Sequence, residues 1–180
     1  SWLGAGVVGT ETGNPNSLYV PDPASRTEEA LYTFTKNLSC VVEYAEKMGV
    51  VVAIEPVCRH IVYDARRARQ VLRSIQSPNL QIILDPVNLL DDCDAGRYKD
   101  VVKEAIEVLG EDVAVIHVKD FSVSDGKIVS MAAGTGIMDY SDLIRFMKTD
   151  KPYIHATLED TVPENAVQAR EFMERLWNEA

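Results

Sequence analysis

Four side chains able to bind a divalent cation each follow or end a short apolar segment of this 180-residue chain. They are two glutamates, an aspartate and a histidine, namely Glu55, Glu159, Asp85 and His117. Carboxylate and imidazole ligands suit Mn²⁺, Mg²⁺ or Co²⁺ better than they suit a thiolate-bound zinc. Because a carboxylate next to a buried segment is costly without a partner, we expect these residues to form a metal site that acts on a small polar substrate.

The segments that precede these side chains have the length and composition of buried strands. Short apolar runs of this kind occupy residues 3–9, 50–54, 80–84, 113–118 and 153–158. The stretches between them carry apolar residues at helical spacing, which predicts a parallel sheet covered by helices. Since the carboxyl ends of parallel strands meet at one edge, this arrangement would gather the four side chains in one place. No change of composition divides the chain, so we expect one domain over residues 1–180.

Several residues mark where the elements begin, turn or end. Thr27 or Ser25 can cap the first long helix, and Gly49 is expected to end it. Residues 125–126 predict a turn inside an excursion that follows the fourth apolar run. Pro163 is expected in the first turn of the last helix, where proline is tolerated.

Composition excludes several classes of function. The formal net charge is −10, which argues against nucleic-acid binding because affinity for phosphates comes mainly from Lys and Arg. No apolar run is long enough to cross a membrane and no signal peptide is evident, so we expect a cytoplasmic protein without a membrane partner. The segment over residues 134–136 lacks the arrangement of a nucleotide-binding loop; it is expected to shape a loop, with phosphate binding as the alternative.

The three cysteines form no CxxC pair and are odd in number. A disulfide framework or a cysteine-bound zinc is therefore not expected. Cys58 follows Glu55 by three positions, but a packing role is favoured over that of a nucleophile.

Five segments of the chain together resemble one known family. IEPVCRH, ILDPVNLL, VIHVKD, AAGTGIMDYSDLI and TLED follow the order of motifs in the xylose isomerase-like TIM barrel superfamily, in its sugar isomerase/epimerase group of the D-tagatose 3-epimerase type. The resemblance covers about residues 3–178 and implies an α/β fold of the (β/α) barrel type. It places the metal ligands at the ends of strands five to eight, so the chain would hold about five βα units, strands 4 to 8. A complete barrel needs about 250 residues, and we therefore expect an incomplete one.

The resemblance also implies a reaction and a cofactor. It implies a divalent metal, Mn²⁺ first with Mg²⁺, Co²⁺ or Zn²⁺ as alternatives, held by Glu55, Asp85, His117 and Glu159. A sugar or sugar phosphate would be isomerised or epimerised by proton transfer through a cis-enediolate, with Glu55 and Glu159 as the two catalytic bases in an order left open.

Further residues are candidates for binding the carbohydrate substrate. Glu11, His60, Asn88 and Lys119 all follow or end apolar runs near the predicted site. Asn88 stands where several epimerases place a substrate-binding histidine, and this departure leaves the identity of the substrate open. Lys119 points to the same side of its strand as His117 by alternation, so it is expected in the pocket or at its rim.

Other interpretations remain open for the same residues. The carboxylates could cap helices or form turns, and His117 could be a core histidine. A related enzyme, a dehydratase of the inosose or dehydroshikimate type, would use the same metal and the same proton abstraction. A third alternative is a catalytically inactive barrel fragment. For each of these alternatives, the unpaired sheet edges near residues 4–9 and 153–158 favour a homo-oligomer.

Overall fold

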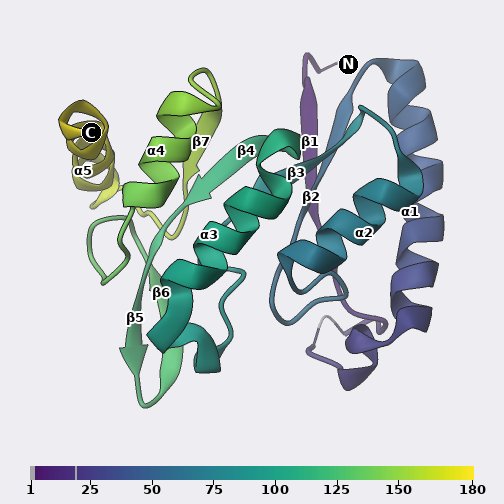
Figure 1. Cartoon of the computed structure of the whole chain (residues 1–180), viewed down its shortest axis with the longest axis horizontal. Helices are drawn as coiled ribbons and strands as arrows, with labels where there is room; N and C mark the ends of the chain where they lie inside the picture. Colours follow the sequence, from purple (N-terminus) through teal and green to yellow (C-terminus); the bar gives the residue numbers. More distant parts are fainter. Residues whose placement is uncertain (1–2, 19) are drawn as a thin grey trace.

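The computed structural model describes residues 3–18 and 20–180, so Ser1, Trp2 and Tyr19 of the predicted domain lie outside the described residues. A parallel sheet forms the centre of the molecule (Figure 1). Its strands run in spatial order β1 (Val7–Glu11), β2 (Val51–Glu55), β3 (Leu80–Leu84), β4 (Val113–Val118) and β7 (His155–Leu158). The sheet curls into a half-barrel, which confirms the predicted incomplete α/β barrel of five βα units.

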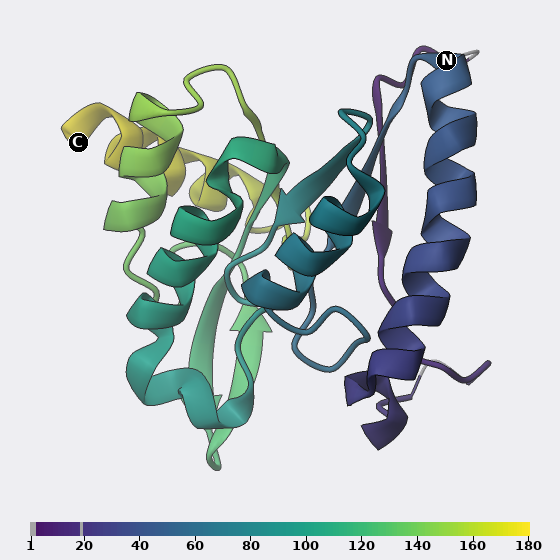
Figure 2. The same cartoon turned by 45° about the vertical axis from the view of Figure 1, so that its right-hand side comes forward.

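An α-helix follows each strand of this sheet in the chain. These helices are α1 (Glu28–Met48), α2 (Ala65–Ile75), α3 (Tyr98–Leu109), α4 (Ser141–Thr149) and α5 (Ala166–Glu179). Three short 3₁₀ turns adjoin these helices: Pro23–Arg26 precedes α1, and Asp92–Arg97 and Gly110–Asp112 flank α3. Figures 1 and 2 show the helices on the outer face of the sheet. Right-handed crossovers between parallel strands put every helix on the same side, which leaves the inner, concave face free.

Most helix boundaries follow the sequence signals, and one does not. The Thr27 hydroxyl accepts a 3.2 Å hydrogen bond from the Ala30 amide, and Gly49 ends α1 with a φ of 62°. The prediction for Pro163 was wrong: it lies in a turn, and α5 begins at Ala166. Asn165 accepts a hydrogen bond from the Val162 amide, and this local turn delays the helix by about one turn.

The first strand also differs from its prediction. It was expected over residues 3–9, but β1 spans Val7–Glu11. Gly4 has a φ of 77°, which is far from the extended conformation of a regular strand. The later start brings Glu11 onto the strand itself, in register with Glu55 of β2.

Strand alternation divides the sheet into two chemically different faces. Residues that face the helices belong to the hydrophobic core, namely Val52, Ile54, Leu80, Ile82, Leu84, Ile116 and Val118. The opposite set lines an open cavity of about 380 Å³ on the concave face, with Val7, Gly9, Glu11, Glu55, Ile83, Val115 and His117 among its residues. Period-two alternation therefore directs the polar strand ends inward while the strands remain anchored by apolar side chains.

A hairpin extends from the carboxyl end of β4. Its strands β5 (Asp120–Ser124) and β6 (Lys127–Met131) pair antiparallel around Asp125 and Gly126, which have φ values of 49° and 74°. This confirms the predicted turn, since an Asp-Gly pair supports the two positive φ angles of a type I′ turn.

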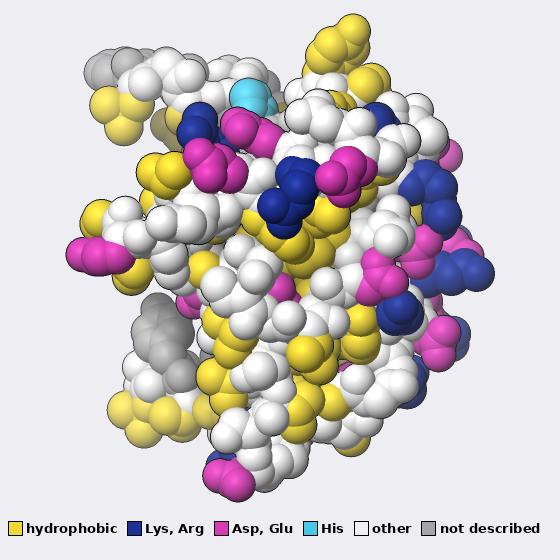
Figure 3. Space-filling view, turned by 90° about the vertical axis from the view of Figure 1, so that its left-hand side faces the viewer, with side chains coloured by type: hydrophobic (Ala, Val, Ile, Leu, Met, Phe, Trp, Pro, Cys, Tyr) yellow, Lys and Arg dark blue, Asp and Glu magenta, His cyan; other side chains and the backbone are white. Residues whose placement is uncertain are grey.

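Strands β1 and β7 form the two edges of the sheet, as the sequence predicted. A groove of about 720 Å³ lies beside β1, lined in part by Val8, Phe34, Leu38 and Val41. A second groove, of about 670 Å³, lies beside β7 and is lined in part by Met147, Ala156, Met173 and Trp177. Figure 3 faces the β7 and α5 end and shows hydrophobic side chains reaching the surface between charged ones. Across the described residues, no helix has the length and apolarity needed to cross a membrane.

Candidate metal centre

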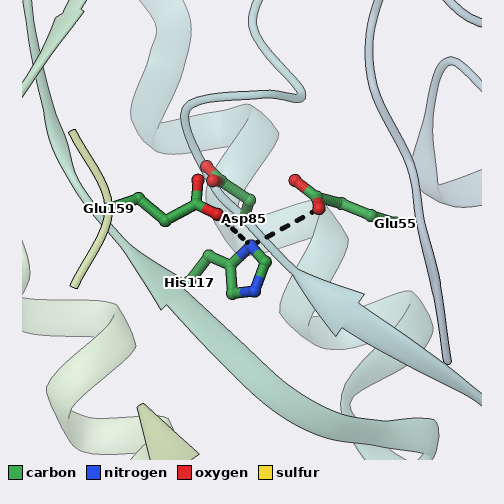
Figure 4. A group of neighbouring side chains, drawn as sticks. All are labelled: Glu55, Asp85, His117 and Glu159. Atoms are coloured by element: carbon green, nitrogen blue, oxygen red, sulfur yellow. Dashed lines mark ion pairs between the residues drawn. The ribbon is translucent and has the colours of Figure 1, made fainter. Parts of the chain in front are cut away.

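The four predicted ligands converge at the carboxyl edge of the sheet (Figure 4). Glu55 ends β2, Asp85 follows β3, His117 lies near the end of β4, and Glu159 follows β7. One ligand atom from each residue lies within 4.8 Å of those from the other three. The amide of Glu159 also donates a 2.9 Å hydrogen bond to the Val118 carbonyl, which holds its backbone against β4.

Glu55 has one oxygen held by a neighbour and one directed at the cluster. Its Oε1 accepts a 2.5 Å hydrogen bond from Nδ2 of Asn88. Its Oε2 lies 3.4 Å from Nδ1 of His117. The side chain is nearly buried, so its orientation is fixed before any ligand arrives.

Asp85 shows the same division of its two oxygens. Oδ1 accepts hydrogen bonds of 2.9 and 3.0 Å from the amides of Val87 and Asn88. Oδ2 lies 2.9 Å from Nζ of Lys119, but the alignment is not that of a hydrogen bond. The residue is 0% exposed, and burial raises the pKa of its carboxyl to about 7, against the opposing effect of Lys119.

Glu159 repeats the pattern a third time, with Lys119 as its donor. Nζ of Lys119 donates a 2.9 Å hydrogen bond to Oε2, and Oε1 lies 2.9 Å from Nδ1 of His117. Burial alone would raise the pKa of Glu159, but the hydrogen bond from Lys119 lowers it overall. Burial likewise opposes the charge on Lys119, yet the carboxylates of Asp85 and Glu159 raise its pKa.

His117 directs Nδ1 at these carboxylates. The neighbouring carboxylate of Glu55 contributes most to raising the imidazole pKa, burial opposes it, and Glu159 adds to the increase. Although oxygens lie close, none is aligned with the ring N–H direction, so Nδ1 is buried without a hydrogen bond among the described residues.

The residues present fit a divalent cation. Nδ1 of His117 and Oδ2 of Asp85 are buried, lack hydrogen bonds in the described part of the chain, and face the same small region. Three carboxylates and one ammonium give the cluster a formal charge of −2 when His117 is neutral. A doubly charged ion would balance this charge and could be bound by both buried atoms, neither of which has a hydrogen bond.

The substrate-binding candidates fall into two groups. Asn88 and Lys119 contact the metal-ligand candidates directly, at Glu55 and at Asp85 and Glu159. Glu11 borders the concave cavity, and its Oε2 lies 3.6 Å from Nδ1 of His60. His60 is therefore beside Glu11, and it is not among the residues that line that cavity.

Cys58 has the properties of a packing residue. Burial, with a smaller contribution from Asp91, raises the pKa of its thiol to about 11. A thiol that stays protonated at neutral pH is a poor nucleophile. This agrees with the preference for packing drawn from its sequence context.

Two supporting residues were not identified from the sequence. The Asp120 carboxylate accepts hydrogen bonds from the amides of Gly134 and Met138, and the Tyr140 hydroxyl donates to the Lys119 carbonyl at 2.9 Å. Asp120 thus engages two amides of the loop for which phosphate binding was the alternative. No sequence spacing links these residues, since the β5–β6 hairpin brings them together; the only signal was the position of Asp120 directly after Lys119.

Comparison with known proteins assigns the family. The family profile described as xylose isomerase-like TIM barrel matches residues 1–176. A search of curated proteins found no match. Among solved structures, a D-tagatose 3-epimerase-like protein superposes with a TM-score of 0.73 at 20% identity, over 96% of this chain and 63% of its own.

Two further solved structures are similar. The probable 3-DHS dehydratase AsbF of Bacillus anthracis, involved in petrobactin synthesis, has a TM-score of 0.72 at 16% identity, over 97% of this chain and 64% of its own. A xylose isomerase-like TIM barrel protein from Mycobacterium smegmatis, in complex with magnesium, has a TM-score of 0.70 at 12% identity, over 98% and 63%. The chain thus spans less than two thirds of each structure, and identities this low establish the fold alone. On the match of the family profile, the chain belongs to the xylose isomerase-like TIM barrel family.

Proposed function

We propose that this chain carries the metal site of a divalent-metal-dependent isomerase or epimerase. Its substrate would be a sugar or sugar phosphate, and the reaction would transfer a proton through a cis-enediolate. The observation that carries the proposal is the convergence of Glu55, Asp85, His117 and Glu159 within 4.8 Å. The similarity in fold to a D-tagatose 3-epimerase-like protein supports the choice of carbohydrate chemistry.

Mn²⁺ is the ion we favour, with Mg²⁺, Co²⁺ and Zn²⁺ as alternatives. Three carboxylates and one imidazole form a mixed oxygen and nitrogen donor set suited to these ions. When bound, such an ion would polarise the substrate's oxygens and stabilise the negative charge that develops after proton removal.

Glu55 and Glu159 are the proposed proton-transfer residues. They come from β2 and β7, with β3 and β4 between them, so they approach the centre from opposite sides. Asn88 holds one and Lys119 holds the other, and each keeps one oxygen free. Two carboxylates on opposite sides of a bound substrate can remove a proton from one face and return it to the other.

Substrate contacts are proposed for the remaining candidates. Glu11 lies on the cavity wall beside Glu55, where it can accept hydrogen bonds from sugar hydroxyls. His60 would orient Glu11 or bind a hydroxyl at the rim of the cavity. Asn88 and Lys119 would keep free hydrogen-bonding capacity for substrate oxygens beside the carboxylates that they hold.

Titration calorimetry with Mn²⁺ on the purified chain tests the metal site. We expect one ion per chain, and no binding by His117→Ala or Glu159→Gln. His155→Ala and Glu164→Gln are the matched controls. His155 begins β7, Glu164 lies a few residues after the end of this strand, and both side chains are exposed. Both variants should bind Mn²⁺ as the original chain does. Binding that persists in His117→Ala and Glu159→Gln would contradict the proposed ligand set.

The reaction is tested with ketoses and ketose phosphates in deuterated water. Proton transfer next to the carbonyl would incorporate deuterium into substrate and epimerised product. Glu55→Gln and Glu159→Gln should lower the rate by at least about 10²–10⁴-fold, the usual contribution of a positioned acid or base, because each residue is also a proposed metal ligand. Rates unchanged by both substitutions would exclude these glutamates as the bases.

A dehydratase is the second candidate. The similarity to the probable 3-DHS dehydratase of Bacillus anthracis, over 97% of this chain, supports it. Such an enzyme would share the metal and the first proton abstraction and would then expel a hydroxyl group. A dehydrated product in the same assay distinguishes it from an epimerase, which conserves the mass of its substrate apart from exchanged deuterium.

Oligomerisation is proposed from the exposed edges of the sheet. β1 and β7 each pair with one neighbour only within the described sheet, and a groove lies beside each of them. A partner that covers these edges, a second copy of the chain in our proposal, would protect unpaired backbone groups. If the chain is instead inactive, metal binding and oligomerisation would persist without turnover.

A further inference from the structure

Lys119 is a buried cation placed among the proposed metal ligands. It is 6% exposed, and its Nζ lies 2.9 Å from Oδ2 of Asp85 and 2.9 Å from Oε2 of Glu159. The hydrogen bond from Tyr140 to the Lys119 carbonyl holds the backbone at this point. The ammonium group is therefore buried within the cluster and paired with two of its carboxylates.

We propose that Lys119 determines the charge of the site and thereby makes it select a divalent cation over a trivalent one. The inference rests on the proposed metal site and concerns its selectivity. In this role Lys119 is a positioning and selectivity residue.

The charges of the cluster lead to this inference. Asp85, Glu55 and Glu159 supply three negative charges, and Lys119 reduces the formal sum to −2. Oδ2 of Asp85, one of the buried atoms without a hydrogen bond, lies 2.9 Å from the ammonium nitrogen. An ion bound to that oxygen must sit close to Nζ, where little solvent screens the repulsion between them. Repulsion grows with ionic charge, so the same ammonium penalises a trivalent ion more than a divalent ion.

Lys119 also has a geometric role, which a test must separate from its charge. Its hydrogen bond to Oε2 leaves Oε1 of Glu159 directed at His117. Lys119→Met removes the charge and the donor but retains an apolar stem of similar length. Lys119→Gln removes the charge and retains a donor, whereas Lys119→Arg retains the charge and alters the geometry. Lys127→Met is the matched control, because Lys127 is exposed in the β5–β6 hairpin.

The experiment compares affinities for Mn²⁺ and Tb³⁺ near neutral pH, by calorimetry and by terbium luminescence. Circular dichroism verifies that each variant is folded. We expect the preference for Tb³⁺ over Mn²⁺ to rise by about tenfold or more in Lys119→Met and Lys119→Gln, because the repulsion they remove acts more strongly on the trivalent ion. The preference should stay at the original value in Lys119→Arg and Lys127→Met. Since both ions need the same ligands, a ratio of affinities is insensitive to a general loosening of the site.

The outcomes separate this inference from the proposed function. Mn²⁺ binding by the original chain with an unchanged ratio in Lys119→Met and Lys119→Gln overturns the inference alone. Tb³⁺ binding by those variants, when the original chain binds neither ion, would overturn both the selection of a divalent ion and the divalent-metal enzyme, because Lys119 would then exclude every cation. Failure of every variant to bind either ion overturns both.

Discussion

The side-chain amide of Asn88 donates a 2.5 Å hydrogen bond to Oε1 of Glu55. Glu55 ends β2 and Asn88 lies in the loop after β3, and the bond leaves Oε2 of Glu55 facing His117. The amides of Asn88 and Val87 simultaneously hold Oδ1 of Asp85. Asn88 thus orients two of the four proposed ligands without being a ligand itself, and such outer contacts commonly affect metal affinity.

Replacing Asn88 should therefore weaken metal binding while the fold persists. Asn88→Ala removes the donor to Glu55 but keeps the backbone amide that holds Asp85, so we expect an affinity for Mn²⁺ lower by about 10–100-fold. Calorimetry measures the effect, and Asn37→Ala on the exposed side of α1 is the control. An unchanged affinity would mean that β2 alone positions Glu55.

The stability of the metal-free chain should fall as the pH rises from about 5 to about 8. Burial raises the pKa of Asp85 from 3.8 in the unfolded chain to about 7, and the pKa of His117 is raised mainly by Glu55. For both groups, the folded state binds the proton more tightly than the unfolded state. The stabilisation that this tighter proton binding gives to the folded state is complete at low pH. It is lost as the pH rises through the folded pKa.

Differential scanning calorimetry in a buffer containing a chelator measures this dependence. The contribution of Asp85 is on the order of a few kcal/mol, since one pKa unit corresponds to about 1.4 kcal/mol. Asp85→Asn, which cannot ionise, should flatten the profile, whereas Asp125→Asn in the exposed hairpin turn should not. Saturating Mn²⁺ should reverse the slope, because metal ligands must be deprotonated. A melting temperature that rises with pH in the metal-free chain would contradict the shift at Asp85.

The sequence predicts the sheet and the ligand set well, for a physical reason. β3 and β4 match their predicted ranges because buried parallel strands are continuous apolar runs, and such runs are read directly from sequence. His117 and Glu159 meet because all parallel strands end at the same edge. Contacts between residues close in the sequence, such as the helix cap that Thr27 forms, were also predictable.

Contacts between side chains of different elements at the carboxyl edge could not be predicted in the same way. Asn88 and Glu55 are 33 positions apart, and no periodicity links an amide to a carboxylate at that distance. The burial of Lys119 against Asp85 depends on the curvature of the sheet and on packing above β4. The start of α5 was misjudged because the turn around Asn165 competes with a helix that Pro163 could also begin.

Arg67 should be among the larger contributors to stability outside the metal site. Its buried guanidinium donates to the carbonyls of Ile61 and Thr27 and pairs with Glu28 at 2.9 Å. Arg67→Met removes the donor to the buried Ile61 carbonyl, and a buried group left unpaired costs about 1–3 kcal/mol. Urea denaturation measures the loss in the free energy of unfolding.

Two substitutions separate the contributions of Arg67. Glu28 is exposed, so Glu28→Gln should change stability by less than about 1 kcal/mol, as expected for a solvent-screened ion pair. Arg73→Met, at an exposed position of the same helix, should have a similarly small effect. Equal losses for Arg67→Met and Glu28→Gln would assign the stability to the ion pair, and would contradict the role of the carbonyl contacts.

Self-association should depend on the edge strand β1. Val8 is 51% exposed on the side of β1 that faces the groove beside α1, where a partner would bury it. A charge at this position should reduce association, because edge lysines oppose strand-to-strand pairing. Sedimentation velocity over a range of concentrations should show that Val8→Lys shifts the chain toward the monomer.

The hairpin provides a control for this substitution. Val129 of β6 is 45% exposed, and Val129→Lys introduces the same charge away from both edges of the parallel sheet. Its sedimentation should match that of the original chain if β1 is the interface, since added net charge alone would affect both variants equally. If Val8→Lys associates as strongly as the original chain, the contact must involve another surface, and the groove beside β7 would be the next to change.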